Sequence, residues 1–224
     1  MCKKILTVAS LILVSSLSAE SAFSSHSIGT KIGTLGIGVE YNTNLIENLD
    51  LRIGINHFKY DFDDTKDNIN YDIDANLKTI SALLDYHPMS NGFILSGGLI
   101  YNGNKVDYKG KATGGTFDIN GVTYNASDVG SLDGEMTFSN LSPYLGIGYN
   151  STVKSTGWNF TADLGVLYQG SAKTTLNVQC GSALTAGQCT TLRNDVAAEK
   201  KEFDDTLKDY KWYPVASVGI SYRF

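Results

Sequence analysis

The feature that most constrains this chain is a series of short segments in which apolar and polar residues alternate. Alternation with period 2 gives a β-strand one apolar face and one polar face. In the last segment, 214–224, the apolar face holds Val218, Ile220, Tyr222 and Phe224. Six earlier segments alternate in the same way, at 34–41, 49–60, 79–86, 93–102, 143–149 and 158–169.

The connections between these segments are alternately short and long. Short turns occupy 42–48, 87–92 and 150–157, and long polar segments occupy 61–78, 103–142 and 170–211. Transmembrane β-barrels have short turns at one end and long loops at the other, whereas a soluble sandwich has no reason to alternate in this way. The sequence therefore predicts an all-β fold, an eight-stranded antiparallel up-and-down transmembrane β-barrel with short periplasmic turns and long outer loops.

Seven segments leave an even-numbered barrel one strand short. If the terminal strand runs inward, segment 34–41 also runs inward and needs an outward strand before it. Only 23–33 is available, so we expect strand 1 there, with a tight outer turn near Gly33. Inward strands then end on tyrosines at one lipid-facing height, which predicts an interfacial girdle of Tyr41, Tyr86, Tyr149 and Tyr222.

The N-terminal residues indicate export. Lys3 and Lys4 precede an apolar run over 5–17 and then small residues, which is the pattern of a secretory signal peptide and is too short to span a bilayer as a helix. We expect residues 1–19 to be the signal peptide and 20–224 to be the barrel domain. Two cysteines, Cys180 and Cys189, remain after cleavage, and an oxidising periplasm would let them form a disulfide.

Composition excludes some classes of protein. The mean hydropathy of −0.11 rules out a helical membrane protein but suits a barrel, because half of each barrel strand is polar. The formal net charge of −5 makes nucleic acid an unsuitable partner.

The long segments are expected to be polar loops. The aspartates of 61–74 alternate in a way that could hold Ca²⁺, but the glycine and final glutamate of an EF-hand loop are missing, so a solvated acidic loop is favoured. In the last loop, four apolar residues recur at helical spacing and predict a short amphipathic helix that packs on its own loop: Leu192, Val196, Phe203 and Leu207.

Signals for catalysis are weak. His57 faces the lipid on segment 49–60, but no serine lies near it along the strand to act with it on a lipid substrate. We find no metal-ligand cluster and no phosphate-binding glycine loop. The sequence therefore predicts a protein that is not an enzyme and has no metal or cofactor.

The polar face of the alternation places five charged residues in the lumen, near the periplasmic end: Glu40, Arg52, Asp85, Asp163 and Arg223. Glu40 and Arg52 flank the same short turn, so we expect them to be cross-strand neighbours. Charges in a narrow lumen must be paired or hydrated. They could form an ion-pair plug that fills the interior or a gate that selects ions.

Short motifs carry a resemblance. Residues 142–149 (SPYLGIGY) and 219–224 (GISYRF) resemble small eight-stranded outer-membrane barrels grouped around OmpA and OmpW. The order of 85–88 (DYHP), 95–98 (LSGG) and 143–146 (PYLG) is similar to CarO-type channels, which are associated with basic amino-acid uptake. The resemblance implies the fold, a bacterial outer-membrane location, and recognition of the terminal Phe224 by the barrel-insertion machinery. No substrate-binding residue carries over.

Two functions remain open at this point. One is a low-conductance, porin-like channel for small solutes, with a small cationic solute as a candidate cargo. The other is a non-conducting structural or surface-interaction barrel that acts through its long external loops. In both cases the expected surroundings are outer-membrane lipid and lipopolysaccharide.

Overall fold

The computed structural model describes residues 25–66, 69–89, 91–112, 114–151 and 156–224. The expected signal peptide, residues 1–19, lies outside this range, as do the first residues of the domain assigned to 20–224. Among the described residues, no helix is both long and apolar enough to span a membrane.

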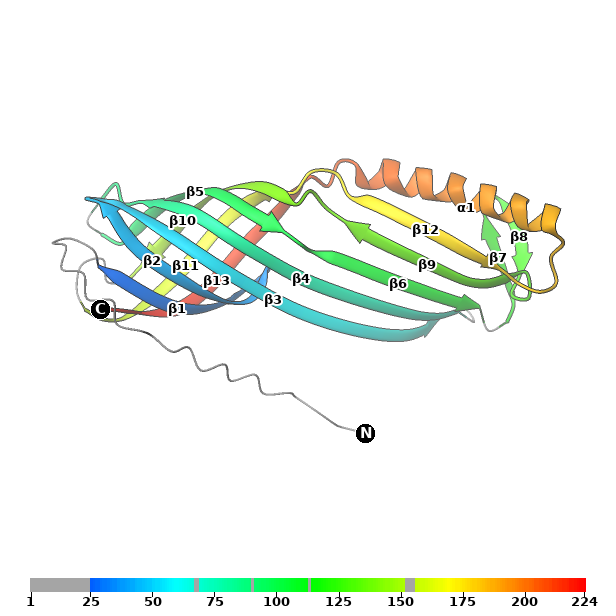
Figure 1. Ribbon diagram of the computed structural model, residues 1–224, viewed down its shortest axis with the longest axis horizontal. Coiled ribbons are helices and arrows are strands. Elements are labelled where there is room, and N and C mark those ends of the chain that lie inside the picture. The colour runs from blue at the N-terminus through cyan, green and yellow to red at the C-terminus, as the bar shows by residue number, and fades with distance from the viewer. Residues whose placement is uncertain (1–24, 67–68, 90, 113, 152–155) are drawn as a thin grey trace, which may run out of the picture.

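Within the described chain, eight antiparallel strands close into a barrel, as predicted (Figure 1). Strand 1 is present, and it closes the ring by pairing with the last strand. Closure leaves no open edge in the ring, which is what a barrel in lipid requires. In ring order the strands are β1 (His26–Gly33), β2 (Gly36–Ile46), β3 (Leu49–Lys66), β4 (Ile69–Tyr86), β5 (Phe93–Asn102), β10 (Leu141–Asn150), β11 (Gly157–Tyr168) and β13 (Trp212–Arg223).

The outer wall of the barrel carries the apolar half of the alternation. Ile55, Leu145 and Ile220 are among the side chains that are more than half exposed there. A belt of this kind matches the lipid-facing band of transmembrane barrels. Aromatic side chains flank the belt, with Tyr41, Tyr86, Tyr149, Trp158 and Phe224 at the end of the short turns and Tyr101, Tyr168 and Trp212 at the opposite rim. We call these the turn end and the extension end.

Segment 61–78, expected to be a polar loop, is instead part of two strands of 18 residues each, β3 and β4. β4 pairs with β5 over residues 79–86 and with β6 (Lys105–Ala112) over residues 69–76. Where β5 gives way to β6, the backbone of Lys78 stays bonded: its N–H donates to Asn104 Oδ1 at 2.9 Å, and its C=O accepts from Gly103 N–H at 2.8 Å. The barrel wall therefore continues beyond the rim without a break in pairing.

The other two long connections, 103–142 and 170–211, also contain regular structure, where the sequence suggested mostly irregular polar loops. They contribute β6, β9 (Val129–Thr137) and β12 (Lys173–Cys180), as well as a hairpin of β7 (Thr116–Ile119) and β8 (Val122–Asn125). The sheet order β3-β4-β6-β9-β12 makes an extension that reaches away from the barrel mouth (Figure 1). We call this part, beginning at residue 58 of β3, the extension sheet.

The predicted amphipathic helix exists and is longer than expected. Helix α1 (Ala186–Leu207) packs on β12 in the extension, as predicted, and buries Leu192 and Val196. Phe203 is exposed, so the apolar stripe is shorter than the sequence suggested. A capping box between Thr185 and Gln188 starts the helix.

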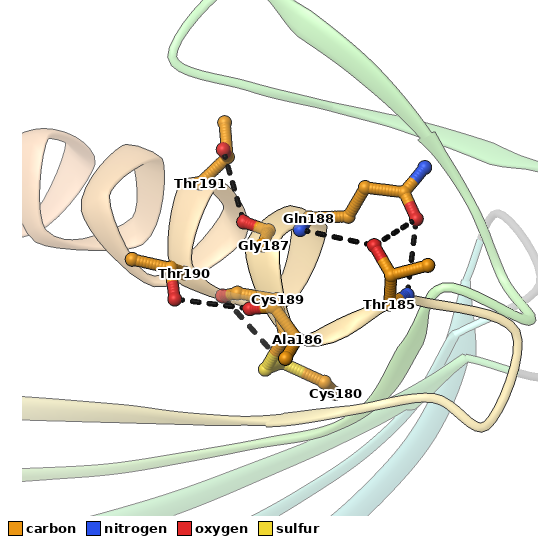
Figure 2. The surroundings of a disulfide bond; sticks show 8 residues. All are labelled: Cys180, Thr185, Ala186, Gly187, Gln188, Cys189, Thr190 and Thr191. Carbon is orange, nitrogen blue, oxygen red and sulfur yellow. Dashed lines mark hydrogen bonds between the residues drawn. A yellow bond between two sulfur atoms is a disulfide. The ribbon is translucent and has the colours of Figure 1, made fainter.

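A disulfide joins Cys180, at the end of β12, to Cys189 in the first turn of α1, as predicted (Figure 2). The two Cα atoms are 5.7 Å apart, and the cysteines are separated by 9 in the sequence. Closing a loop of that length removes unfolded-state entropy worth about 2–3 kcal/mol. The bond therefore fixes the start of α1 to the sheet that the helix covers.

The β7–β8 hairpin is held to α1 by Asp195. The turn is an Asn-Gly pair, Asn120 and Gly121, with positive φ at both residues, as tight hairpins favour. Asp195 accepts hydrogen bonds from Tyr124 Oη at 2.5 Å and from Asn120 Nδ2 at 3.1 Å. These donors lower the pKa of Asp195, and the same bond, with burial, raises the pKa of Tyr124 to about 12.

Acidification should loosen this hairpin. Because the folded-state pKa of Asp195 lies below its usual value, its contribution is present above the unfolded pKa of about 4 and is lost as the pH falls further. Amide-exchange protection factors over 116–125 should be lower at about pH 3 than at pH 6, while barrel amides keep theirs. Asp195→Ala should already be loosened at pH 6. Asp118→Asn, which removes a carboxylate whose hydrogen bond lies within the hairpin, is the control; equal protection at both pH values in the parent protein would contradict the assignment.

Candidate functional site

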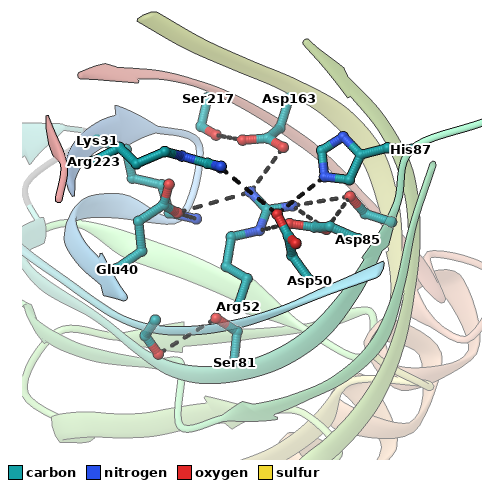
Figure 3. Close-up of polar contacts among 12 residues, drawn as sticks. Lys31, Glu40, Asp50, Arg52, Ser81, Asp85, His87, Asp163, Ser217 and Arg223 are labelled. Carbon is teal, nitrogen blue, oxygen red and sulfur yellow. Dashed lines mark hydrogen bonds and ion pairs between the residues drawn. The ribbon is translucent and has the colours of Figure 1, made fainter. Parts of the chain in front are cut away.

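The lumen of the barrel contains a cluster of charged side chains centred on Arg52. An eight-stranded barrel is only wide enough inside for side chains. Four of the five predicted lumen residues, Glu40, Arg52, Asp85 and Asp163, are buried together there, each less than 10% exposed. They come from β2, β3, β4 and β11, so the cluster spans the lumen from one wall to the other (Figure 3).

All three guanidinium nitrogens of Arg52 lie close to carboxylate oxygens. Its Nε lies 2.8 Å from Asp85 Oδ2, and its Nη1 donates to Asp163 Oδ1 at 2.9 Å. Its Nη2 donates to Asp85 Oδ1 at 3.0 Å and to Ser96 Oγ at 2.9 Å. A planar group with five donors suits this fork-like pairing with two carboxylates.

Glu40 is paired mainly with a lysine that the sequence analysis did not identify. Lys31 Nζ lies 2.9 Å from Glu40 Oε2, whereas Arg52 Nη1 lies 3.8 Å from the same oxygen. Glu40 and Arg52 are cross-strand neighbours, as predicted, but they are not directly opposite each other. Glu40 faces Gly54, and Arg52 faces Asn42, so the two are diagonal neighbours. We call Lys31, Glu40, Arg52, Asp85 and Asp163 the Arg52 cluster.

The fifth predicted residue, Arg223, belongs to a second group nearer the turn end. Its Nη2 lies 3.8 Å from Asp50 Oδ2, which also pairs with His87 Nε2 at 3.1 Å (Figure 3). Nη1 of Arg223 donates to Ser25 Oγ at 3.2 Å. We call Asp50, His87 and Arg223 the Asp50 cluster.

Together the two clusters are close to electrical balance. Four carboxylates (Glu40, Asp50, Asp85 and Asp163) face three cations (Lys31, Arg52 and Arg223), so the formal sum is 3 − 4 = −1 before any charge on His87. Buried charges are tolerated when they are paired and hydrogen-bonded. Removing one cation would therefore raise the carboxylate excess inside the barrel from one to two.

An apolar layer closes the lumen on the extension side of the Arg52 cluster. It consists of Leu35, Leu83, Ile100, Tyr144, Leu167 and Val215. The ring of Tyr144 lies over two glycines, because a Cβ on Gly146 or Gly165 would lie only 2.3 or 2.5 Å from its Oη. The glycines of β10 and β11 thus make room for the largest side chain of the layer.

Arg52 stands between two small cavities. One, of about 20 Å³, is bounded by Lys31, Arg52 and the apolar layer. The other, also of about 20 Å³, lies toward the turn end and is lined by both Arg52 and the Asp50 cluster. Each volume is near that of a single water molecule. In this conformation the lumen is closed by the Arg52 cluster and by the apolar layer.

The sequence analysis missed three residues of these clusters. Lys31 lies on strand 1, on the face opposite Ile28, Thr30 and Ile32, so strand parity could have placed it in the lumen. Asp50 has the same parity as Arg52, so the alternation of the strand could have placed it in the lumen as well. His87 follows β4 in a turn, so no strand parity could place its ring inside.

The remaining candidate residues lie elsewhere. His57 is exposed on the outer wall of β3, in the position expected from strand parity. Among the described residues, no group of histidine, cysteine and carboxylate side chains could hold a metal ion. Four of the aspartates of 61–74 instead face each other across β3 and β4, with Asp61 opposite Asp74 and Asp63 opposite Asp72.

No protein-family model matches the chain, and no curated protein matches it. Among solved structures, the chain is similar to CarO2 of Acinetobacter baumannii, with a TM-score of 0.56 and 21% identity over 92% of this chain and 100% of that one. It is similar to CarO of the same organism, with a TM-score of 0.53 and 20% identity over 88% and 97%. A major outer membrane protein from Thermus thermophilus also matches, with a TM-score of 0.46 and 14% identity over 91% and 100%.

The likeness to the two CarO structures shows that the chain has the fold of an outer-membrane β-barrel. It supports, at the level of the fold, the similarity that the short strand motifs suggested. These structures do not confirm the grouping with OmpA and OmpW that the motifs suggested.

Arg52→Ala should strongly destabilise the barrel. The change leaves Asp85 and Asp163 buried without their cation, which costs about 3–5 kcal/mol. Replacing both partners as well, in Arg52→Ala with Asp85→Asn and Asp163→Asn, should recover part of that loss because no unpaired charge remains. Urea unfolding in lipid vesicles measures both. Lys109→Ala, at an exposed position of the extension, controls for loss of a cation. A triple variant no more stable than Arg52→Ala would contradict the ion-pair role.

Proposed function

We propose that this protein is a bacterial outer-membrane barrel that acts as a low-conductance channel for small solutes and is closed at rest by the Arg52 cluster together with the apolar layer. The observation that carries the proposal is the position of Arg52 between two cavities in a polar lumen. A wall made of one guanidinium group and its partners can rearrange with water, whereas a packed apolar core cannot do so without exposing apolar surface. The charged layer therefore has the properties of a gate.

The fold gives the proposal an orientation. The turn end would face the periplasm and the extension sheet would face outward, because short turns in such barrels are periplasmic. Outer-membrane lipid and lipopolysaccharide would surround the apolar belt. Phe224, which is exposed beside Tyr222 at a ring distance of 5.3 Å, would be available to the insertion machinery.

The charge balance suggests the class of solute. Carboxylates exceed cations by one in the two clusters, so an added positive charge is better tolerated in the lumen than an added negative charge. Small cationic solutes are the proposed cargo. No catalytic step forms part of this proposal.

A second candidate function is a non-conducting barrel that presents the extension to other molecules. Two observations favour it: each lumen cavity has room for only about one water molecule, and five strands and a helix are devoted to the extension. Folded elements on the exposed side of a scaffold are frequent interaction sites. Conductance separates the two functions.

The location can be tested first. The protein should fractionate with the outer membrane, and its unheated band on a detergent gel should migrate differently from the boiled band, because a closed barrel resists detergent until heated. Recovery as a soluble periplasmic protein would remove the basis for both candidate functions.

The gate can be tested in planar bilayers. Arg52→Ala changes the formal sum of the clusters to 2 − 4 = −2, so the variant should conduct more than the parent and prefer cations more strongly. Glu40→Gln changes the sum to 3 − 3 = 0, so it should weaken the plug without adding cation preference. Single-channel conductance and reversal potentials in a salt gradient measure both effects.

A matched control is Glu135→Gln, which removes a carboxylate from the extension and leaves the lumen unchanged. It should conduct like the parent. If Arg52→Ala and Glu40→Gln also conduct like the parent and admit the same cationic solutes, the gate is excluded and the interaction function becomes the better assignment.

A further inference from the structure

The outward half of β3 is an open sheet edge. β2 pairs with β3 only as far as His57, whereas β4 pairs with it along its whole length. From residue 58 onward, within the described chain, β3 therefore has a strand on one side only, and Figure 1 shows it as the outermost strand of the extension. Unpaired N–H and C=O groups on such an edge form a template for another strand.

An aromatic ladder accompanies this edge. Phe58, Tyr60 and Phe62 lie on one face of β3 and are 42%, 54% and 42% exposed. Their rings follow each other at 6.5 and 6.4 Å between centroids and are nearly parallel, at 6° and 13°. Helix α1 packs on β12, at the opposite edge of the sheet, and so leaves the ladder uncovered.

The other face of the same edge is acidic. Asp61 and Asp63 lie there, with Asp74 and Asp72 opposite them on β4. Lys59 is the cation of this group and is already paired with Asp61 and Asp74, at 3.2 Å each. The formal sum over Lys59 and the four aspartates is 1 − 4 = −3. A strand placed beside β3 would therefore face apolar rings on one side and negative charge on the other.

We propose that the β3 edge of the extension binds an extended peptide in which apolar residues alternate with basic ones, by adding it as a further strand to the sheet. The backbone edge requires a strand, the ladder selects apolar side chains at every second position, and the aspartates select Lys or Arg at the positions between. This binding surface is separate from the lumen, so it does not depend on conduction.

A second copy of the chain is a poorer occupant. Copies inserted in one bilayer point the same way, so two β3 edges could meet only as parallel strands. Two copies that meet in parallel through the same edge are related by a two-fold axis along the strands, which exchanges the two faces, so the acidic face of one copy would continue into the aromatic face of the other and match neither. The acidic edge therefore favours a basic partner over self-association.

The test uses the full-length protein in detergent and a fluorescent eight-residue peptide that alternates valine and lysine. Anisotropy should report binding above that to empty micelles. A valine–glutamate peptide of equal length should bind at least about tenfold more weakly, because attraction becomes repulsion at several positions. A valine–lysine peptide with alternate amides N-methylated should lose binding to a similar extent, because it cannot complete the edge.

Variants assign the binding to this edge. Asp61→Lys with Asp63→Lys should weaken the valine–lysine peptide about tenfold, and Tyr60→Thr should weaken it while keeping strand propensity. Glu202→Lys with Asp209→Lys makes the same change of net charge at exposed residues away from β3 and should bind like the parent. Unchanged gel migration of each variant would show that the barrel is intact.

Several results would overturn the proposal. They are absence of binding, equal binding of the N-methylated peptide, equal loss in the Glu202→Lys/Asp209→Lys control, or concentration-dependent dimers of the parent protein that Tyr60→Thr weakens. The last result would assign the edge to a second copy of this chain.

Discussion

The pairing of Arg52 in a lumen too narrow for bulk water is the interaction on which the rest of the barrel depends. A cation in that position must find its carboxylates on other strands, and it finds them on the neighbouring β4 and on β11 across the lumen. A slip of one residue in any of these strands would turn the charged side chain toward the lipid. The Arg52 cluster therefore fixes strand register as well as closing the interior.

The lengths of β3 and β4 determine the other half of the molecule. Because both strands continue past the rim, their outward halves need new partners, and β6 takes the place of β5 beside β4. β9 and β12 extend the sheet, and α1 with its disulfide covers it near β12. Growth stops at that side, while the β3 side stays open. The β12 edge is covered and the β3 edge is open because every strand that the chain adds to the extension after β4 is added on the β4 side.

The barrel was predictable because each of its strands repeats one simple pattern. Apolar alternation placed the seven later strands, counting backwards placed β1, and parity placed Glu40, Arg52, Asp85, Asp163 and Arg223 inside. The extension was missed because its strands are rich in Asp, Asn and Lys, which disfavour strands. Alternation was nevertheless present, as in Ile73, Ala75 and Leu77 against Asp72, Asp74 and Asn76. For these strands the period-2 alternation was a better guide to structure than the amino-acid composition.

Contacts between distant strands were beyond a reading of local pattern. Parity can say that Lys31 and Glu40 face the lumen, but not that Lys31 is nearer to Glu40 than Arg52 is. That choice depends on the register of β1 with β2, in which Glu40 faces Gly29 and lies diagonal to Lys31. Likewise, His87 reaches Asp50 because its backbone lies beside the turn that precedes β3, where its N–H bonds to Asn48 C=O at 2.9 Å.

The two closures of the lumen differ in chemistry, and together they restrict what a channel of this kind could pass. A small ion that enters alone can exchange partners with the Arg52 cluster, but it must lose most of its water at the apolar layer, where Leu83, Tyr144 and Leu167 offer little in return. A wholly apolar molecule would be disfavoured at the Arg52 cluster instead, because it cannot pair with the buried charges there. A solute with a cationic group and an apolar body can satisfy both layers in turn, because its charge can rest among the carboxylates while its body occupies the apolar layer. On the channel proposal, an amphipathic cation is therefore better suited to this lumen than a simple metal ion.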